Sequence, residues 1–156
     1  MNAPVTQDLN AYGFSTEIRV RLSETDAVGI VFFGSFAAYF DVGRMDYLAH
    51  LGLHRFDGHV RDLAPGAVVA HQVDFHNPAR YNDTLVVRVR IAHLGRSSYT
   101  FHFFVSDKRT RKPVATGRLT LVWLDESFQP VALPDAFRET VRAFEGELLA
   151  GGSAGA

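Results

Sequence analysis

Apolar and polar residues alternate from Phe14 to Leu22, which is the two-residue period of a half-buried strand. The period changes at Ser35, and from there to Leu51 the apolar residues recur at spacings of three and four, as in a helix. Gly52 offers a stop for this helix. Residues 36–40 are apolar on nearly all sides. We therefore predict a central helix that is enclosed on most sides.

Four further strand-like segments follow in the second half of the chain. They are Ala67–Phe75, Thr84–Ala92, Tyr99–Ser106 and Val114–Leu124. Short connections favour antiparallel neighbours among these four strands. The irregular segment 23–34 is interpreted as a structured loop and residues 55–65 as a polar loop, while a closing helix is predicted to begin near Pro134 and to bury Phe137, Val141 and Phe144. One sheet covers one side of a buried helix, so a second copy of the chain is predicted to cover the rest.

Length and composition exclude several classes of protein and of functional site. A chain of 156 residues fits one domain, which we place at residues 14–146, between an N-terminal tail (1–13) and a flexible C-terminal tail (147–156). The absence of cysteine excludes disulfides, a thiolate nucleophile and Cys-ligated metals. A net charge of −1 argues against a general nucleic-acid binder. We find no secretory signal and no apolar stretch long enough to span a bilayer, so a cytoplasmic protein without membrane insertion is expected.

A block of residues from the loop into the helix, together with four shorter segments, resembles the 4-hydroxybenzoyl-CoA thioesterase family of acyl-CoA thioesterases. The first block is Thr25-Asp26-Ala27-Val28-Gly29-Ile30-Val31-Phe32-Phe33-Gly34-Ser35-Phe36, followed by Asp41 and Arg44. The shorter segments are Phe75–Asp83, Gly95–Ser98, Ala115–Gly117 and Leu133-Pro134. The resemblance covers residues 14 to 145. Where many members of that family carry a Tyr or His just before the helix, this chain has Phe33, so a side-chain hydrogen bond from that position is lost.

The resemblance implies an α+β hotdog fold, an antiparallel sheet wrapped around a long central helix. It also implies an acyl-CoA thioesterase that needs no metal or other cofactor, and a homodimer or a tetramer of two dimers with active sites between subunits. The catalytic carboxylate of the family matches Asp26. The family's nucleotide-binding turn matches Gly95-Arg96-Ser97, so Arg96 and Ser97 are the predicted contacts to coenzyme A.

Thioester hydrolysis needs a nucleophile or base and a group that stabilises negative charge on the carbonyl oxygen. Free N–H groups at a helix N-terminus, near Phe33, Gly34 and Ser35, suit the second role. Gly34 would also leave room for the thioester. Asp26 would attack the carbonyl carbon or activate water. Aromatic residues such as Phe32 and Phe36 suit an acyl ring or an aliphatic chain equally well.

Each of these residues also has a structural interpretation. Asp26 would cap its own turn, Asp41 would pair with Arg44 at the i,i+3 spacing, and Arg96 would lie on a solvated face. Four histidines and the G-x-S-x-G pattern at the C-terminus are not interpreted as functional sites. His50 and His54 lack a nearby acid of the HExxH type, His71 and His76 are interpreted as structural, and Gly151–Gly155 lacks the strand and helix that a serine nucleophile requires. Two alternative functions stay open at this point: a hotdog dehydratase or hydratase, and a non-catalytic acyl-CoA-binding domain.

Overall fold

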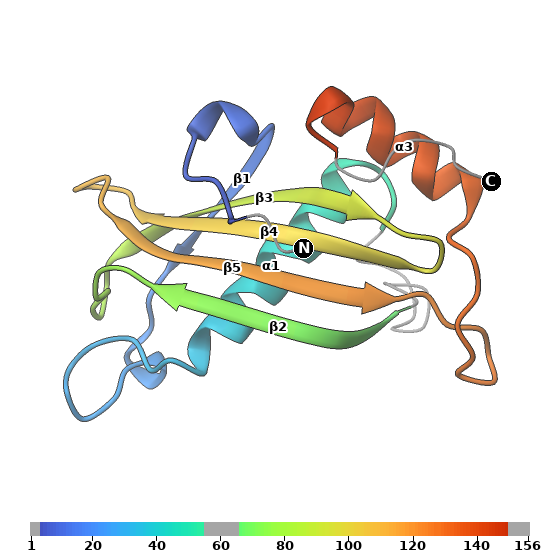
Figure 1. Ribbon diagram of the computed structural model, residues 1–156. Coiled ribbons are helices and arrows are strands. Elements are labelled where there is room, and N and C mark those ends of the chain that lie inside the picture. The colour runs from blue at the N-terminus through green and yellow to red at the C-terminus, as the bar shows by residue number, and fades with distance from the viewer. Residues whose placement is uncertain (1–3, 55–65, 150–156) are drawn as a thin grey trace.

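Five strands join in one antiparallel sheet, in the order β1-β3-β4-β5-β2 (Figure 1). The strands are β1 (Phe14–Arg19), β2 (Ala67–Phe75), β3 (Thr84–Leu94), β4 (Ser98–Asp107) and β5 (Pro113–Val122). The computed structural model describes residues 4–54 and 66–149, so the predicted polar loop at 55–65 and most of the C-terminal tail lie outside the described residues.

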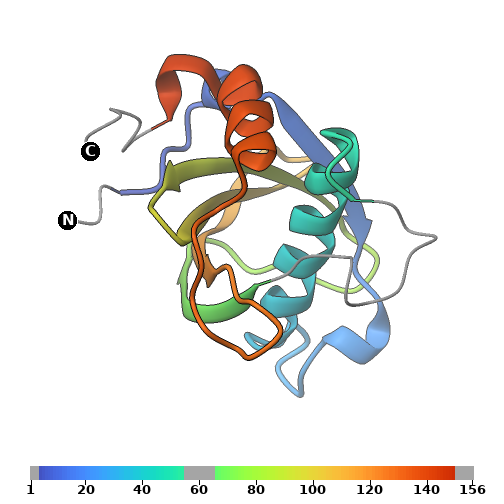
Figure 2. The ribbon, with the colours of Figure 1, turned by 90° about the vertical axis from the view of Figure 1, so that its right-hand side faces the viewer.

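The helix α1 (Ser35–His50) lies across the concave face of this sheet (Figure 2). Its buried face includes Phe36, Phe40 and Tyr47, and the backbone at Gly43 approaches the sheet so closely that a Cβ there would lie 3.0 Å from Val87. The predicted central helix is therefore confirmed. Its opposite side is open within one chain, where Val42 is 45% exposed.

Strand neighbours differ from the predicted arrangement in one respect. β2 and β3 follow each other in sequence, but β2 pairs with β5, and β1 takes the free edge of β3. Residues 76–83 cross the end of the sheet between β2 and β3, which short-connection reasoning did not anticipate. The first strand is also shorter than predicted, because Leu22–Glu24 forms the 3-10 helix η2 and Leu22 is exposed.

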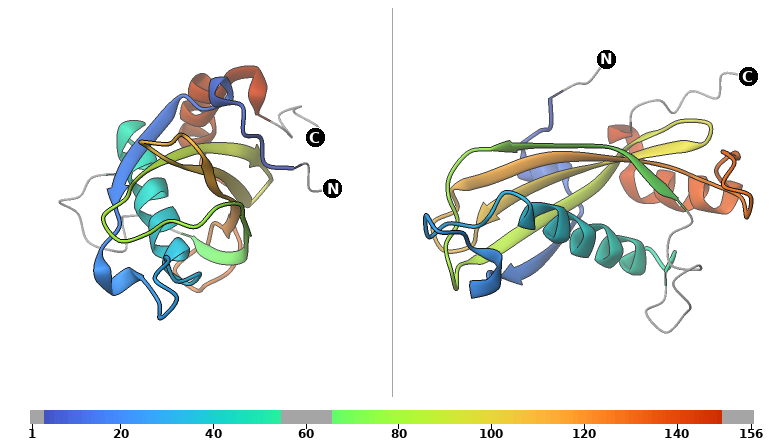
Figure 3. Two further views of the ribbon diagram at one scale, coloured as in Figure 1. Left: turned by 90° about the vertical axis from the view of Figure 1, so that its left-hand side faces the viewer. Right: turned by 90° about the horizontal axis from the view of Figure 1, so that it is seen from below.

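Both ends of the described chain pack against the sheet (Figure 3). The helix α3 (Asp135–Glu145) buries Phe137 and Val141, as predicted, whereas Phe144 is only partly buried, and the 3-10 helix η3 (Gly146–Leu148) follows it. Near the N-terminus the 3-10 helix η1 (Leu9–Ala11) precedes Tyr12, whose ring lies 6.4 Å from that of Phe104 on the outer face. No helix among residues 4–54 and 66–149 is long and apolar enough to cross a membrane.

A buried carboxylate joins α1, β3 and α3. Glu145 is 6% exposed, and its Oε1 accepts hydrogen bonds from the Tyr47 hydroxyl (2.5 Å) and the Ile91 N–H (3.1 Å). Ile91 lies beyond the part of β3 that pairs with β1, so Glu145 supplies the acceptor that a neighbouring strand would otherwise provide. Burial raises the pKa of Glu145, and this outweighs the two hydrogen bonds and the charge of Arg90, which lower it.

We expect Glu145→Leu to lower the free energy of unfolding by at least about 2 kcal/mol, because each buried donor left without an acceptor costs about 1–3 kcal/mol. Glu145→Gln keeps an acceptor oxygen and should cost less.

The contribution of Glu145 to stability should depend on pH. Since folding raises the pKa of Glu145, this contribution is full below the ordinary value of 4.5 and is lost as the pH rises through the folded pKa. Urea unfolding of both proteins across this range should show that the free energy of unfolding of wild type falls relative to that of Glu145→Gln as the pH rises. A pH-independent difference would contradict this assignment.

Candidate active site

The segment between η2 and α1 is a loop held at both ends by backbone hydrogen bonds. Its two sides meet at the bridge between Thr25 and Val31, and the N–H of Asp26 donates to the carbonyl of Ile30 (2.9 Å). At the tip, Gly29 has φ +84°, a conformation that residues with a Cβ rarely adopt. The N–H of Val31 donates to the carbonyl of Ala79 (2.8 Å), which ties the loop to the segment after β2. The predicted structured loop is thus a tight excursion fixed against the sheet end.

Asp26 stands at the base of this excursion and is partly exposed. Its Oδ1 accepts a hydrogen bond from the N–H of Val28 (2.9 Å), so the predicted turn-capping role is confirmed. The other carboxylate oxygen, Oδ2, accepts no hydrogen bond from the described residues. The turn therefore orients the carboxylate through one oxygen and leaves the second available to a ligand.

The start of α1 presents two unused donors. The N–H of Ser35 donates to the carbonyl of Phe32 (2.9 Å), so the prediction that Ser35 has a free N–H is wrong. The N–H groups of Phe33 and Gly34 donate to no atom of the described residues. They precede the first helical residues, where the helix dipole adds partial positive charge. Two adjacent free donors at this position can bind an oxygen that carries developing negative charge.

The two aromatic residues before the helix have different surroundings. The ring of Phe32 lies 4.5 Å from that of Phe33, and a Cβ on Gly34 would come within 2.5 Å of the Phe32 ring. The space beside Gly34 is thus filled by Phe32, which corrects the expectation that this glycine leaves room for the thioester. Phe32 packs beside Phe33 and Gly34 rather than lining the cavity, which differs from its predicted place at the substrate, whereas Phe33 is 69% exposed at the cavity.

A cavity of about 510 Å³ brings the loop, the helix and the segment after β2 together. Its walls come mainly from apolar side chains, with Asp26 among them. The lining residues are Asp26, Ile30, Val31, Phe33, Phe36, Phe75, His76, Asn77, Pro78 and Ala79. The rings of Phe36 and Phe75 meet edge to face at 5.2 Å. An apolar chamber lined by one carboxylate and by Phe33, whose N–H is free, suits an acyl group attached to a polar, reactive carbonyl.

Two polar lining residues were not predicted as part of the site. His76 was interpreted as structural, and its Nε2 does lie 3.0 Å from the Thr116 hydroxyl, yet the residue also borders the cavity. The side-chain amide of Asn77 donates to the carbonyl of Pro113 (2.7 Å) and fixes the same wall. Their place in the Phe75–Asp83 segment of the resemblance was the available signal.

The rival candidates lie elsewhere. Asp41 forms the predicted ion pair with Arg44, with 2.6 Å between Oδ1 and Nη2, and does not line the cavity. His50 packs its ring against Phe14 (5.1 Å), and His71 packs edge to face on Phe40. Within residues 4–54 and 66–149 there is no group of three or more His, Asp or Glu side chains able to hold a metal ion.

Arg96 and Ser97 lie in the turn between β3 and β4, at the end of the sheet opposite the Asp26 loop (Figure 1). This turn is tied to the C-terminal part of the chain, because the carbonyl of Arg96 accepts from the N–H of Leu133 (2.8 Å) and from the Arg138 guanidinium (2.7 Å). Arg96 is exposed. One chain therefore does not place Arg96 or Ser97 beside Asp26.

Comparison with known proteins places this geometry in context. Residues 28–114 match the Thioesterase superfamily. The acyl-acyl carrier protein thioesterase ATL3 of Arabidopsis thaliana is 29% identical over 122 residues, which are 78% of this chain and 64% of ATL3, so the match spans less than two thirds of that relative. The acyl-CoA thioester hydrolase YbgC of Escherichia coli is 28% identical over 95 residues, 60% of this chain and 69% of YbgC.

Solved structures agree with these matches. A Thermus thermophilus thioesterase, crystallised with coenzyme A and zinc, superposes with a TM-score of 0.76 at 29% identity and covers 88% of this chain and 98% of its own. The predicted α+β hotdog fold is confirmed.

Proposed function

The chain belongs to the Thioesterase superfamily, and from this premise we propose that it is an acyl-CoA thioesterase that hydrolyses an acyl-CoA to the free acid and coenzyme A. The observation that carries this proposal is the placement of Asp26 and Phe33 at one apolar cavity, with free N–H groups on Phe33 and on the next residue, Gly34. We further propose that it falls within the 4-hydroxybenzoyl-CoA thioesterase family, on the residues of the Asp26 loop. The cytoplasmic location expected from the sequence stays a prediction.

In the proposed mechanism the thioester carbonyl oxygen accepts hydrogen bonds from the N–H groups of Phe33 and Gly34. The Asp26 carboxylate either attacks the carbonyl carbon or removes a proton from an attacking water. Attack by Asp26 forms an acyl anhydride and expels the thiolate of coenzyme A, which takes a proton, and water then cleaves the anhydride. In the alternative, water adds directly and the same thiolate leaves. Each preorganised donor is worth about 3–4 kcal/mol in the transition state.

Thiol release distinguishes this proposal from the two alternatives. A panel of short-chain, long-chain and aromatic acyl-CoAs, followed with a thiol reagent, should show hydrolysis of at least one member. Binding of acyl-CoA without thiol release would instead identify a non-catalytic acyl-CoA-binding domain. Hydration of an enoyl-CoA would identify a hydratase. The same panel would define the preferred acyl group. The apolar walls of the cavity favour an apolar one.

We also propose that two copies of the chain assemble along β2. This strand is an edge of the sheet with one neighbour, β5, and it carries exposed apolar side chains at Val68 (50%), Val69 (59%) and Phe75 (54%). Long apolar edges with few charges are sites of strand pairing. The open side of α1 around Val42 faces outward as well. Pairing of two β2 strands would cover both surfaces and bring a second chain to the cavity wall at Phe75.

We expect light scattering to show a dimer or a tetramer at micromolar concentration. Val69→Glu should shift the protein toward monomer, because a dimer would bring two buried carboxylates to one interface. Leu9→Glu is the matched control, since Leu9 is similarly exposed (54%) but belongs to η1, away from β2. A monomeric wild type, or equal effects of the two substitutions, would contradict assembly along β2.

A further inference from the structure

The hydroxyl of Ser35 reaches from the start of α1 to the other side of the Asp26 loop. Its Oγ donates to the carbonyl of Glu24 (3.0 Å), which lies 11 positions earlier in the chain. A serine at the N-terminus of a helix usually caps it, by accepting from a free N–H of the first turn. Here the capping position is taken by Gly34, which has no side chain. The Ser35 hydroxyl therefore joins two segments of the site instead of closing the helix end.

The same carbonyl of Glu24 accepts a second hydrogen bond, from the N–H of Phe32 (2.9 Å). Phe32 and Ser35 stand on either side of Phe33 and Gly34, the two residues with free N–H groups. One acceptor atom thus holds the chain directly before and directly after the proposed oxyanion donors.

The backbone of this turn also sets the direction of the two free N–H groups. The carbonyl of Phe32 accepts from the N–H of Ser35 (2.9 Å). The carbonyl of Phe33 accepts from the N–H of Phe36 (3.3 Å). In a trans peptide the C=O and the N–H point in opposite directions. Since both carbonyls point along the helix, the N–H groups of Phe33 and Gly34 point out of its start, and a movement of Ser35 would turn the first of these peptides.

The Glu24 end of this connection is fixed close to Asp26. The N–H of Glu24 donates to the carbonyl of Arg21 (3.0 Å), and its carboxylate accepts from the N–H of Arg21 (2.7 Å), at the end of η2. Asp26 follows two residues later, and its N–H donates to the carbonyl of Ile30. The Glu24 carbonyl therefore belongs to the same hydrogen-bonded segment as the Asp26 carboxylate.

We propose that Ser35 is a positioning residue whose hydroxyl holds the oxyanion donors in register with Asp26, an inference that rests on the proposed function. The donors must meet the carbonyl oxygen while the carboxylate serves the carbonyl carbon, and a displacement of about 1 Å can cost a hundredfold in rate. The bond from Phe32 to Glu24 would remain without the hydroxyl, so the loss should be partial. Ser35 is not among the residues that line the cavity, so substrate binding should not depend on it.

The test begins with Ser35→Ala, which removes the hydroxyl. We expect kcat for acyl-CoA hydrolysis to fall about tenfold with KM little changed, since only the alignment of the reacting groups is altered. Ser35→Thr keeps a hydroxyl and should restore kcat to within about twofold of wild type. NMR relaxation should show lower order parameters for the amides of Phe33 and Gly34 in Ser35→Ala than in wild type.

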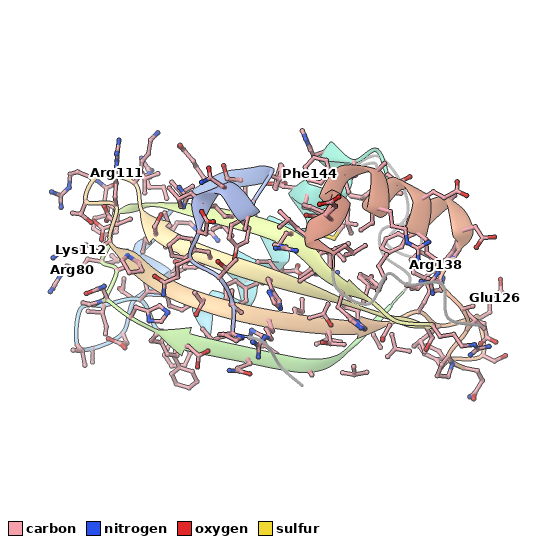
Figure 4. All side chains as sticks on the ribbon, turned by 45° about the horizontal axis from the view of Figure 1, so that its top comes forward. Arg80, Arg111, Lys112, Glu126, Arg138 and Phe144 are labelled. Atoms are coloured by element: carbon pink, nitrogen blue, oxygen red, sulfur yellow. The ribbon has the colours of Figure 1, made fainter. Side chains whose placement is uncertain are left out.

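Thr140→Val is the matched control, because it removes a hydroxyl that also donates to a backbone carbonyl, that of Ala136 on α3 (2.8 Å). Arg138 on this helix and Arg80, which follows the cavity residue Ala79, lie at opposite ends of the molecule (Figure 4). The control should therefore keep the kcat and the KM of wild type.

An unchanged kcat in Ser35→Ala would overturn the inference. An equal fall in Thr140→Val would also overturn it, because it would indicate a general loss of stability. A rise in KM with kcat unchanged would make Ser35 a substrate contact and likewise overturn the inference. Absence of thiol release from wild type would refute the proposed function alone. The order parameters would then decide the holding role of Ser35, which unchanged values in Ser35→Ala would overturn.

Discussion

Asp26→Asn should lower kcat for acyl-CoA hydrolysis at least about a hundredfold, within the range lost when a positioned acid or base is removed. Asparagine matches aspartate in size but lacks the charge that makes Asp26 a nucleophile or base. Its side-chain oxygen can still accept the hydrogen bond from the N–H of Val28, so the loop should keep its shape. Substrate binding should therefore be largely retained, and KM should change little.

Asp41→Asn is the matched control for this experiment. Asp41 is 59% exposed, pairs with Arg44 and does not border the cavity, so its replacement should leave kcat within a few-fold of wild type. Circular dichroism and thermal unfolding of both variants would establish that the fold survives. A nearly wild-type Asp26→Asn together with an inactive Asp41→Asn would mean that the helix acid, not the loop acid, carries the reaction.

The second large effect concerns stability and arises where α1 meets the sheet. Gly117 on β5 lies under Phe40, and a Cβ at this position would be 2.2 Å from that ring. Phe40 cannot move away easily, because it is fully buried and stacked on Phe103 with 4.3 Å between ring centroids. The backbone carbonyl of Gln72 would also lie 3.0 Å from the new atom. Gly117→Ala should thus force the helix or the strand to shift.

We expect Gly117→Ala to lower the free energy of unfolding by about 2–3 kcal/mol, the upper part of the usual range for overpacked cores. Urea unfolding would measure the loss. Phe40→Leu makes room for the new methyl group, so the double variant should be less unstable than the sum of the two single changes. Strict additivity would show that the clash is relieved elsewhere, and that Phe40 is not the residue that requires glycine at position 117.

Hydrophobic periodicity located the main elements, because a helix and a strand that each bury one face repeat their apolar residues at different spacings. The change of period at Ser35 marks the first residue of α1, and the closing helix and the four later strands fall where the pattern places them. That pattern tells which face of a strand is buried but not which strand lies beside it. For this reason the pairing of β2 with β5, and of β1 with β3, was missed.

The sequence by itself determined the loop with Asp26, the start of the helix at Ser35 and the apolar character of the residues between them, since all lie within one short segment. Only the tertiary structure decided that residues some fifty positions later, His76 and Asn77, complete the cavity wall. It also decided that the N–H of Ser35 is used while those of Phe33 and Gly34 are free. Local pattern records burial and turn chemistry, whereas the meeting of distant segments and the assignment of each hydrogen bond follow from how the whole chain packs.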